Sequence, residues 1–462
     1  MLATKTYVER RNMLAERLGS GLVLFMGHDE IPMNFKDNPY PFWQDSSFLY
    51  YMGLEDPGLA ALIDIEESYT TLFGHNRTLD EIVWAGELPN LSERGADVGI
   101  EDCRPIEELG DQISLALQGG RTVHFLPLYR DSTTVKVARL LEIPSADVET
   151  LVSRELVEAV VAQRSIKSAE EVDEIERAVD LACEIHSLAM RLARPGMKEQ
   201  EVVGAIEGLL LSKGSAVSFP VIFSVRGEVL HNHNHENIMQ EGDLAILDAG
   251  AMSAAGYASD ITRTFPVGNS FSPRQRDIYQ IVLAAQEAAI KALTPGKPYE
   301  EIHMLAAHAI AAGLKDLGLL KGDVEAAVEQ GAHALFFPHG LGHMMGLDVH
   351  DMESLGEDHV GYDDSVTRST QFGRSYLRLA KSLEPGHVIT VEPGLYFIPQ
   401  LIDSWAGDQR LAEFIAYDKL DEWKDFGGVR IEDDLLVTDE GYRLLGQPIP
   451  KSVEAVEELS TF

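Results

Sequence analysis

Cysteine is almost absent from this sequence, and long apolar runs are missing. Only Cys103 and Cys183 occur among 462 residues, too few for a disulfide framework or a thiolate metal cage. Nowhere do about 18 apolar residues run together, so no membrane-spanning helix is predicted. The first residues, MLATKTYVERRNML, carry charges throughout and lack the apolar stretch of a secretory signal. These absences predict a cytoplasmic protein.

Basic residues are scarce relative to acidic ones. Lys and Arg number 38 against 75 Asp and Glu, for a formal net charge of −37. Binding to nucleic acid or to an anionic membrane requires a basic surface, and no basic stripe is visible. The chain is 45% apolar and 24% charged, which is ordinary for a soluble globular protein and too apolar for a disordered one.

A length of 462 residues suits two domains better than one compact core. Residues 1–163 alternate short β-like runs with helical stretches, which predicts a small N-terminal α/β domain. The β-like runs are 21–26, 59–65, 69–73 and 122–126, and the helical stretches are 105–117 and 135–141. No catalytic cluster is visible in this part. Residues 164–462 form the second predicted domain.

The second domain contains a duplicated pattern. Ser168 followed by Glu171 is a capping box, and apolar residues spaced three and four apart then predict a helix with one buried face. Pro195-Gly196 ends this helix, and a second runs from 199 to about 211. The same arrangement returns with helices at 273–293 and 299–314 around Pro295-Gly296. We interpret it as a duplicated helix–helix–sheet unit in an α/β (α+β) fold, whose halves pack around a shared sheet with a site between them.

Carboxylates end or interrupt several apolar strands of this domain. Asp248 ends an apolar run and Asp260 opens another, so a hairpin would bring both onto one face; aspartate beside glycine is equally typical of a plain turn. Glu392 and Glu432 lie in β-branched or apolar strands of the second half. A carboxylate in such a place is costly to bury unless something compensates its charge. Metal ions would supply that compensation.

Three histidines, His339, His343 and His350, are threaded through glycine in FFPHGLGHMMGLDVHD. One alone would suit a structural role, whereas three favour a metal ligand with proton-handling partners. Four carboxylates and one imidazole form an oxygen-rich set for two divalent cations. Such a set favours Mn²⁺ or Mg²⁺ over structural zinc, and Co²⁺ or Zn²⁺ would also fit.

The segments LDAG…GYASDITRTFPV, FFPHGLGHMMGLDVHD, TVEPGLYF and GGVRIEDD together resemble the pita-bread metallopeptidases, in their proline-specific branch of prolidase and aminopeptidase P. The resemblance covers roughly residues 165–455, and the N-terminal region resembles the smaller leading domain of that family. It implies a pita-bread catalytic domain, two divalent ions, most readily Mn²⁺, and a homodimer. It also implies a metal-bridged hydroxide that attacks the scissile carbonyl of an Xaa-Pro bond.

The resemblance assigns roles to individual residues. It implies five metal ligands, which are Asp248, Asp260, His343, Glu392 and Glu432. Glu392 would also act as general base, with His339 and His350 near the scissile and proline carbonyls. His231, Arg378 and Arg430 would contact substrate.

Two departures from the family pattern stand out. Eleven residues separate Asp248 from Asp260, one more than is common, which predicts an altered turn or bulge. Asn232 follows His231 where tyrosine is frequent. For His233 and His235 we favour a solvated loop.

Few features of the sequence distinguish the prolidase branch from the aminopeptidase P branch. Arg378 falls where prolidases bind the carboxylate of a dipeptide, and the insertion between Glu392 and Glu432 is of the prolidase type. The spacing from His231 to Asp248 is instead that of aminopeptidase P. We therefore expect an Xaa-Pro dipeptidase, with aminopeptidase P acting on longer peptides as the alternative.

Two more distant alternatives exist. A catalytically inactive binding protein on the same fold would have lost ligands, yet all five positions hold competent residues. The sequence leaves open a side activity on organophosphates.

Overall fold

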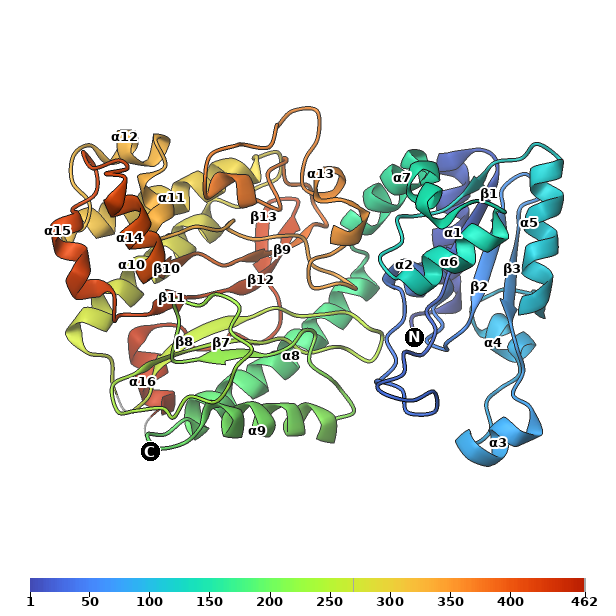
Figure 1. Cartoon of the computed structure of the whole chain (residues 1–462), viewed down its shortest axis with the longest axis horizontal. Coiled ribbons are helices and arrows are strands. Elements are labelled where there is room, and N and C mark those ends of the chain that lie inside the picture. The colour runs from blue at the N-terminus through green and yellow to red at the C-terminus, as the bar shows by residue number, and fades with distance from the viewer. Residues whose placement is uncertain (269, 461–462) are drawn as a thin grey trace. The chain divides into compact units, whose positions relative to one another are not determined.

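The computed structural model describes residues 1–268 and 270–460, which divide into two compact units (Figure 1). The first unit comprises Met1–Arg164 and Ser354–His359, and the second comprises Ser165–Glu353 and the chain from Val360 on. Ser354–His359 falls within the range predicted for the second domain, and residues 461–462 of that range lie outside the described residues. No helix among the described residues combines the length and apolarity needed to cross a bilayer.

A five-stranded mixed sheet forms the centre of the first unit. Its order is β4-β3-β2-β1-β5, with β4 and β5 parallel to their neighbours and the other pairs antiparallel. The strands are β1 (Leu22–Met26), β2 (Ala60–Asp64), β3 (Tyr69–Gly74), β4 (Asp102–Pro105) and β5 (Val123–His124). The four predicted β-like runs coincide with β1, β2, β3 and β5. The sequence of β4, DCRP, has no alternating apolar pattern and gave no such signal.

The first unit also contains helices, and two of them complete the core of the sheet. The helices are α1 (Thr4–Leu18), α2 (Ser46–Met52), α3 (Leu79–Ala85), α4 (Leu91–Asp97), α5 (Leu109–Gln118), α6 (Asp131–Leu140) and α7 (Arg154–Ser165). Leu24, Leu62 and Phe73 of the sheet pack in one buried cluster with Ile113 of α5 and Val137 of α6. The apolar faces of sheet and helices thus cover each other.

The duplicated helices of the second unit are present as the sequence predicts. The first pair is α8 (Ala169–Leu192) and α9 (Glu199–Ser212), and the second is α10 (Pro273–Lys291) and α11 (Tyr299–Asp316). Both bonds of the capping box between Ser168 and Glu171 are formed at the start of α8. The shorter helices are α12 (Val324–Glu329), α14 (Pro399–Gly407), α15 (Tyr417–Leu420) and α16 (Val453–Ser460). The short helix α13 (Glu357–Val360) belongs to the first unit except for Val360.

Among the described residues, the strands of the second unit form three small sheets rather than one shared sheet. Their orders are β6-β7-β8, β13-β12-β9 and β10-β11. The strands are β6 (Ile222–Ser224), β7 (Leu244–Asp248), β8 (Thr262–Pro266), β9 (Val388–Val391), β10 (Gly394–Tyr396), β11 (Gly428–Arg430), β12 (Asp433–Thr438) and β13 (Gly441–Leu444). In the view of Figure 1, β7 and β8 lie above α9, and β10 and β11 lie beside α10.

The two halves are joined beside β8. The Glu432 N–H donates to Thr262 O at 3.0 Å, and the Thr264 hydroxyl donates to Arg430 O at 2.9 Å. The fully buried guanidinium of Arg263 also donates to Glu432 O at 2.6 Å. These bonds fix the segment that carries Glu432 against the strand that follows Asp260.

Candidate metal centre

A hairpin between β7 and β8 places Asp248 and Asp260 on one face. The pairing of Asp248 with Thr262 continues without a break to Met252 with Ala258. The extra residue therefore lies in the turn, where the Ser253 N–H donates to Tyr257 O at 2.8 Å, and the ladder holds no bulge. Gly250 is required here because a Cβ would lie 1.7 Å from Ser259 O.

His343 faces the same point from the other half of the unit. Its Nδ1–H donates to Met344 O at 3.0 Å, which leaves Nε2 as the unprotonated nitrogen. That Nε2 lies 3.3 Å from Asp260 Oδ2 and 3.7 Å from Glu392 Oε1. One donor atom each of Asp260, His343 and Glu432 lies within 4.8 Å of the others, and all three residues are buried.

The carboxylates of this cluster keep oxygens without partners. Asp248 Oδ1, Asp260 Oδ1 and Glu432 Oε1 are buried and accept no hydrogen bond. Their sister oxygens on Asp248 and Glu432 are held, by Arg430 Nη2 at 2.7 Å and by the Thr262 hydroxyl at 2.7 Å. Buried anionic oxygens left open in this way are typical of ligands to a hard cation.

The raised pKa values of the clustered carboxylates also indicate a cation site. Burial raises the pKa of Asp260 and of Glu432 well above the usual range, and neighbouring carboxylates raise it further. Burial also raises the pKa of Glu392 to about 7. Divalent cations would compensate this concentrated negative charge and would ligate the open oxygens. The residues present therefore fit a divalent metal centre.

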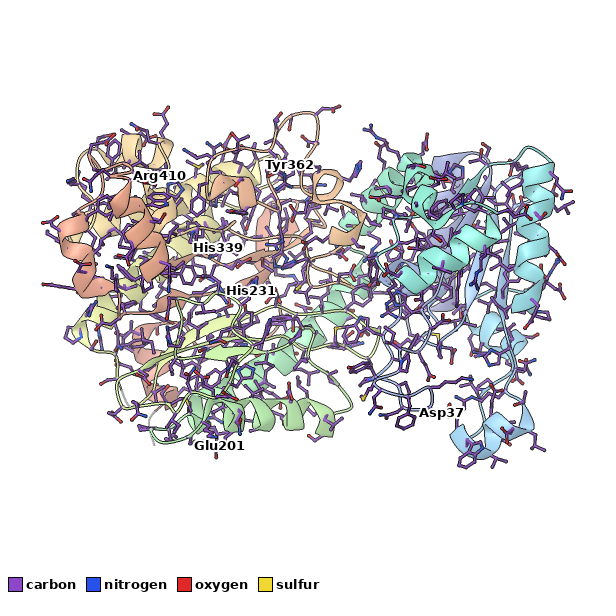
Figure 2. The ribbon with its side chains drawn as sticks, viewed as in Figure 1. Asp37, Glu201, His231, His339, Tyr362 and Arg410 are labelled. Atoms are coloured by element: carbon purple, nitrogen blue, oxygen red, sulfur yellow. The ribbon has the colours of Figure 1, made fainter. Side chains whose placement is uncertain are left out.

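A pocket of about 110 Å³ contains these side chains together with the predicted substrate contacts. Its lining includes all the predicted site residues, which are His231, Asp248, Asp260, His339, His343, His350, Arg378, Glu392, Arg430 and Glu432. His231 is exposed at its rim, and Figure 2 shows His231 and His339 in the middle of the second unit. His233 is exposed as predicted. His235 lies in the same loop and is half-buried, with Nδ1 bonded to Phe223 O at 3.0 Å.

Tyr396 forms a hydrogen bond with His339 that the sequence pattern did not predict. The Tyr396 hydroxyl donates to His339 Nε2 at 2.9 Å and accepts from Arg430 Nη1 at 2.9 Å, while His339 Nδ1–H donates to Gly340 O at 2.7 Å. Burial lowers the pKa of His339 to about 3, so its ring is neutral. Tyr396 belongs to the segment TVEPGLYF, which indicates that it lies near Glu392. The segment does not indicate which residues its hydroxyl contacts.

His350 and Arg378 share a second such neighbour, Glu353. Glu353 Oε2 accepts from His350 Nδ1 and lies 3.3 Å from Arg378 Nε. The rings of His350 and His343 lie 4.2 Å apart between centroids. His350 thus stands directly beside the predicted ligands.

Comparison with known proteins assigns the chain to a family. Residues 173–439 match Metallopeptidase family M24, and residues 7–124 match the Aminopeptidase P N-terminal domain. The chain belongs to metallopeptidase family M24. The pita-bread fold and the smaller leading domain inferred from the sequence motifs are thereby confirmed, and membership of this family implies the divalent metal centre that the donor set fits.

Individual M24 relatives cover almost the whole chain. The human Xaa-Pro dipeptidase is 31% identical over 97% of this chain and 91% of its own length. The Escherichia coli Xaa-Pro aminopeptidase is 30% identical over 99% of this chain and 98% of its own length. The structure of E. coli aminopeptidase P with the inhibitor Pro-Leu superposes with a TM-score of 0.82 at 30% identity, covering 100% of this chain and 98% of that one. Overall identity therefore does not separate the two branches.

Proposed function

We propose that this M24 member is a dinuclear-metal hydrolase of Xaa-Pro peptide bonds that prefers dipeptides. The observation that carries the proposal is the buried group of Asp260, His343 and Glu432 with carboxylate oxygens left open. The relatives that match along nearly the whole chain are Xaa-Pro dipeptidases and aminopeptidases. We propose Mn²⁺ as the metal because carboxylate oxygens dominate the donor set.

In this proposal Asp248, Asp260, His343, Glu392 and Glu432 hold the ions. Two divalent cations, when bound, lower the pKa of a water molecule and polarise a carbonyl. Glu392 takes the proton from the attacking water and passes it to the leaving proline nitrogen. His350 donates its Nδ1–H to Glu353, so Nε2 of the neutral ring is an acceptor and donates to a substrate carbonyl only when the ring is protonated.

The structure of the substrate explains why such a site is needed. An Xaa-Pro bond is a tertiary amide without an N–H, so a peptidase that binds substrate through that donor loses its contact. Recognition must then come from the carbonyl, from the ring and from the chain ends. The histidines and arginines around the 110 Å³ pocket can supply these contacts.

Arg378 carries the preference for dipeptides. It lines the same pocket as the predicted metal ligands, and it is the side chain there that we assign to the substrate carboxylate. A guanidinium can bind a carboxylate through two parallel hydrogen bonds. A free carboxylate on the proline itself would place the end of the substrate at this arginine.

The test compares Ala-Pro with Ala-Pro-Leu in wild type and Arg378→Ala. We expect wild type to prefer the dipeptide, and Arg378→Ala to raise KM for Ala-Pro by about tenfold to a hundredfold, the equivalent of ~1.5–3 kcal/mol for a charged hydrogen bond. Arg410→Ala is the matched control, because Arg410 is exposed and stacks on Trp405 at 4.0 Å. Unchanged KM for Ala-Pro in Arg378→Ala would refute the carboxylate role.

One observation favours aminopeptidase activity as the second candidate. A larger, mainly apolar cavity of about 580 Å³ shares Leu230, His339, Tyr376 and Arg378 with the metal pocket, and α14 contributes to its wall. It offers room for a residue beyond proline. Faster cleavage of Ala-Pro-Leu than of Ala-Pro by wild type would assign the chain to this branch.

A further inference from the structure

Glu353 contacts two residues that line the metal pocket, His350 and Arg378. It begins the short helix Glu353–Leu355, three positions after His350. The same carboxylate oxygen, Oε2, accepts from His350 Nδ1 and lies 3.3 Å from Arg378 Nε. His350 and Arg378 both line the metal pocket, and Glu353 is not part of that lining.

The contact between His350 and Glu353 is a hydrogen bond from an imidazole N–H to a carboxylate. Nδ1 of His350 donates to Glu353, so the ring presents Nε2 elsewhere and its orientation is fixed. The hydrogen bond from His350 lowers the pKa of Glu353 to about 2. Glu353 therefore stays ionised and continues to accept both bonds at any pH near neutrality.

Glu353 could affect Arg378 in two opposite ways. Its negative charge could weaken the attraction of Arg378 for a substrate carboxylate, or its contact could hold the guanidinium in place. The Arg378 and Glu353 side chains are 34% and 38% exposed, so water screens the charge effect. Orientation of a long side chain with many rotamers is then the larger effect.

We propose that Glu353 is a positioning residue for recognition of the substrate's C-terminal carboxylate, because its Oε2 accepts from Arg378 Nε and is itself held by His350 Nδ1. This inference rests on the proposed function and extends it to a residue outside the pocket. It requires that the effect of Glu353 on carboxylate recognition be exerted through Arg378.

The experiment measures kcat and KM for Ala-Pro and for Ala-Pro amide, which lacks the carboxylate, together with bound metal. We expect Glu353→Ala to raise KM for Ala-Pro about tenfold and KM for the amide less than twofold, at unchanged metal content. Glu353→Gln keeps an acceptor oxygen and should recover most of the lost affinity. Asp364→Ala, which changes an exposed acid outside the pocket lining, should match wild type.

A double variant separates positioning from a general structural effect. In the Arg378→Ala background, Glu353→Ala should produce no further rise in KM for Ala-Pro, because the residue through which it acts is gone. Equal KM increases for both substrates, additive effects in the double variant, or loss of metal in both Glu353 variants would overturn the proposal. If Arg378→Ala alone leaves KM for Ala-Pro unchanged, the dipeptide proposal itself fails, which is a distinct result.

Discussion

A buried ion pair supports the loop that carries His343 and His350. Lys167 Nζ lies 2.8 Å from Asp351 Oδ2, and each side chain is only 1% exposed. Asp351 directly follows His350, and its N–H donates to Met344 O at 2.9 Å, next to His343. The pair thereby connects the start of the second unit to the loop with both histidines.

Removing the positive partner should destabilise the fold strongly. Lys167→Met removes a buried ion-pair partner of the Asp351 carboxylate, for an expected loss of about 3–5 kcal/mol in the free energy of unfolding. Urea titration of the metal-loaded protein measures it. Lys5→Met, which removes an exposed partner of Glu9, serves as control and should stay within about 1 kcal/mol of wild type. A loss equally small for Lys167→Met would show that the pair contributes little.

Residue identities in the site differ in how far the sequence predicts them. Asp248 and Glu432 interrupt apolar strands, so their burial cost already indicates a compensating ion. Tyr396 and Glu353 have no such local signature, because each acquires its role by contacting residues far away or on another segment. Tyr396 meets His339 across 57 positions and Arg430 across 34. Only the folded chain shows these contacts.

At the scale of elements, the helix α11 and the turn Ala332–Leu335 bury two histidines against each other. His303 and His333 have ring centroids 6.3 Å apart, and neither nitrogen of either ring has a hydrogen-bond partner. His303 also packs on Phe337, which in turn packs on His339. Burial lowers the pKa of His333 to about 4 and that of His303 well below its usual range, where the neighbouring His333 adds to the effect.

These two histidines should make the fold sensitive to acid. An unfolded histidine binds a proton below about pH 6.5 whereas the buried one does not, so stability is lost as pH falls from 6.5 towards 4. Between pH 6.5 and 5 the loss is about 2 kcal/mol per histidine. Urea titrations at pH 6.5 and pH 5 measure the change in the free energy of unfolding between the two pH values. This change should be smaller for His333→Leu than for wild type. It should equal the wild-type change for His233→Leu, because His233 is exposed. An unchanged difference in His333→Leu would contradict this account.

The elements themselves follow from the sequence to different degrees. The helices α8 and α10 have capping boxes and a long apolar period, and both are predicted closely. The short strand β4 lacks such a pattern. The single shared sheet was wrong, because the strands pair in separate small sheets. The halves meet through single contacts such as the Glu432 N–H with Thr262 O, and no local period encodes which distant strands pair.

At the scale of the whole molecule, the predicted ligands come from both halves of the second unit. Asp248 and Asp260 lie on either side of the turn in the β7–β8 hairpin of the first half. His343, Glu392 and Glu432 belong to the second half. Cations bound between them would bridge the two halves and stabilise the folded state, because the unfolded chain offers no such arrangement. The homodimer expected from the resemblance stays a prediction.

The most direct test of the central claim is the metal content of the purified protein, measured beside Ala-Pro hydrolysis before and after chelation. We predict about two divalent ions per chain, loss of activity on chelation and recovery with Mn²⁺. Glu432→Gln should bind less metal and lose about a hundredfold or more in kcat. A metal-free protein that cleaves Ala-Pro at full rate, or a Glu432→Gln variant equal to wild type in both measurements, would contradict the account.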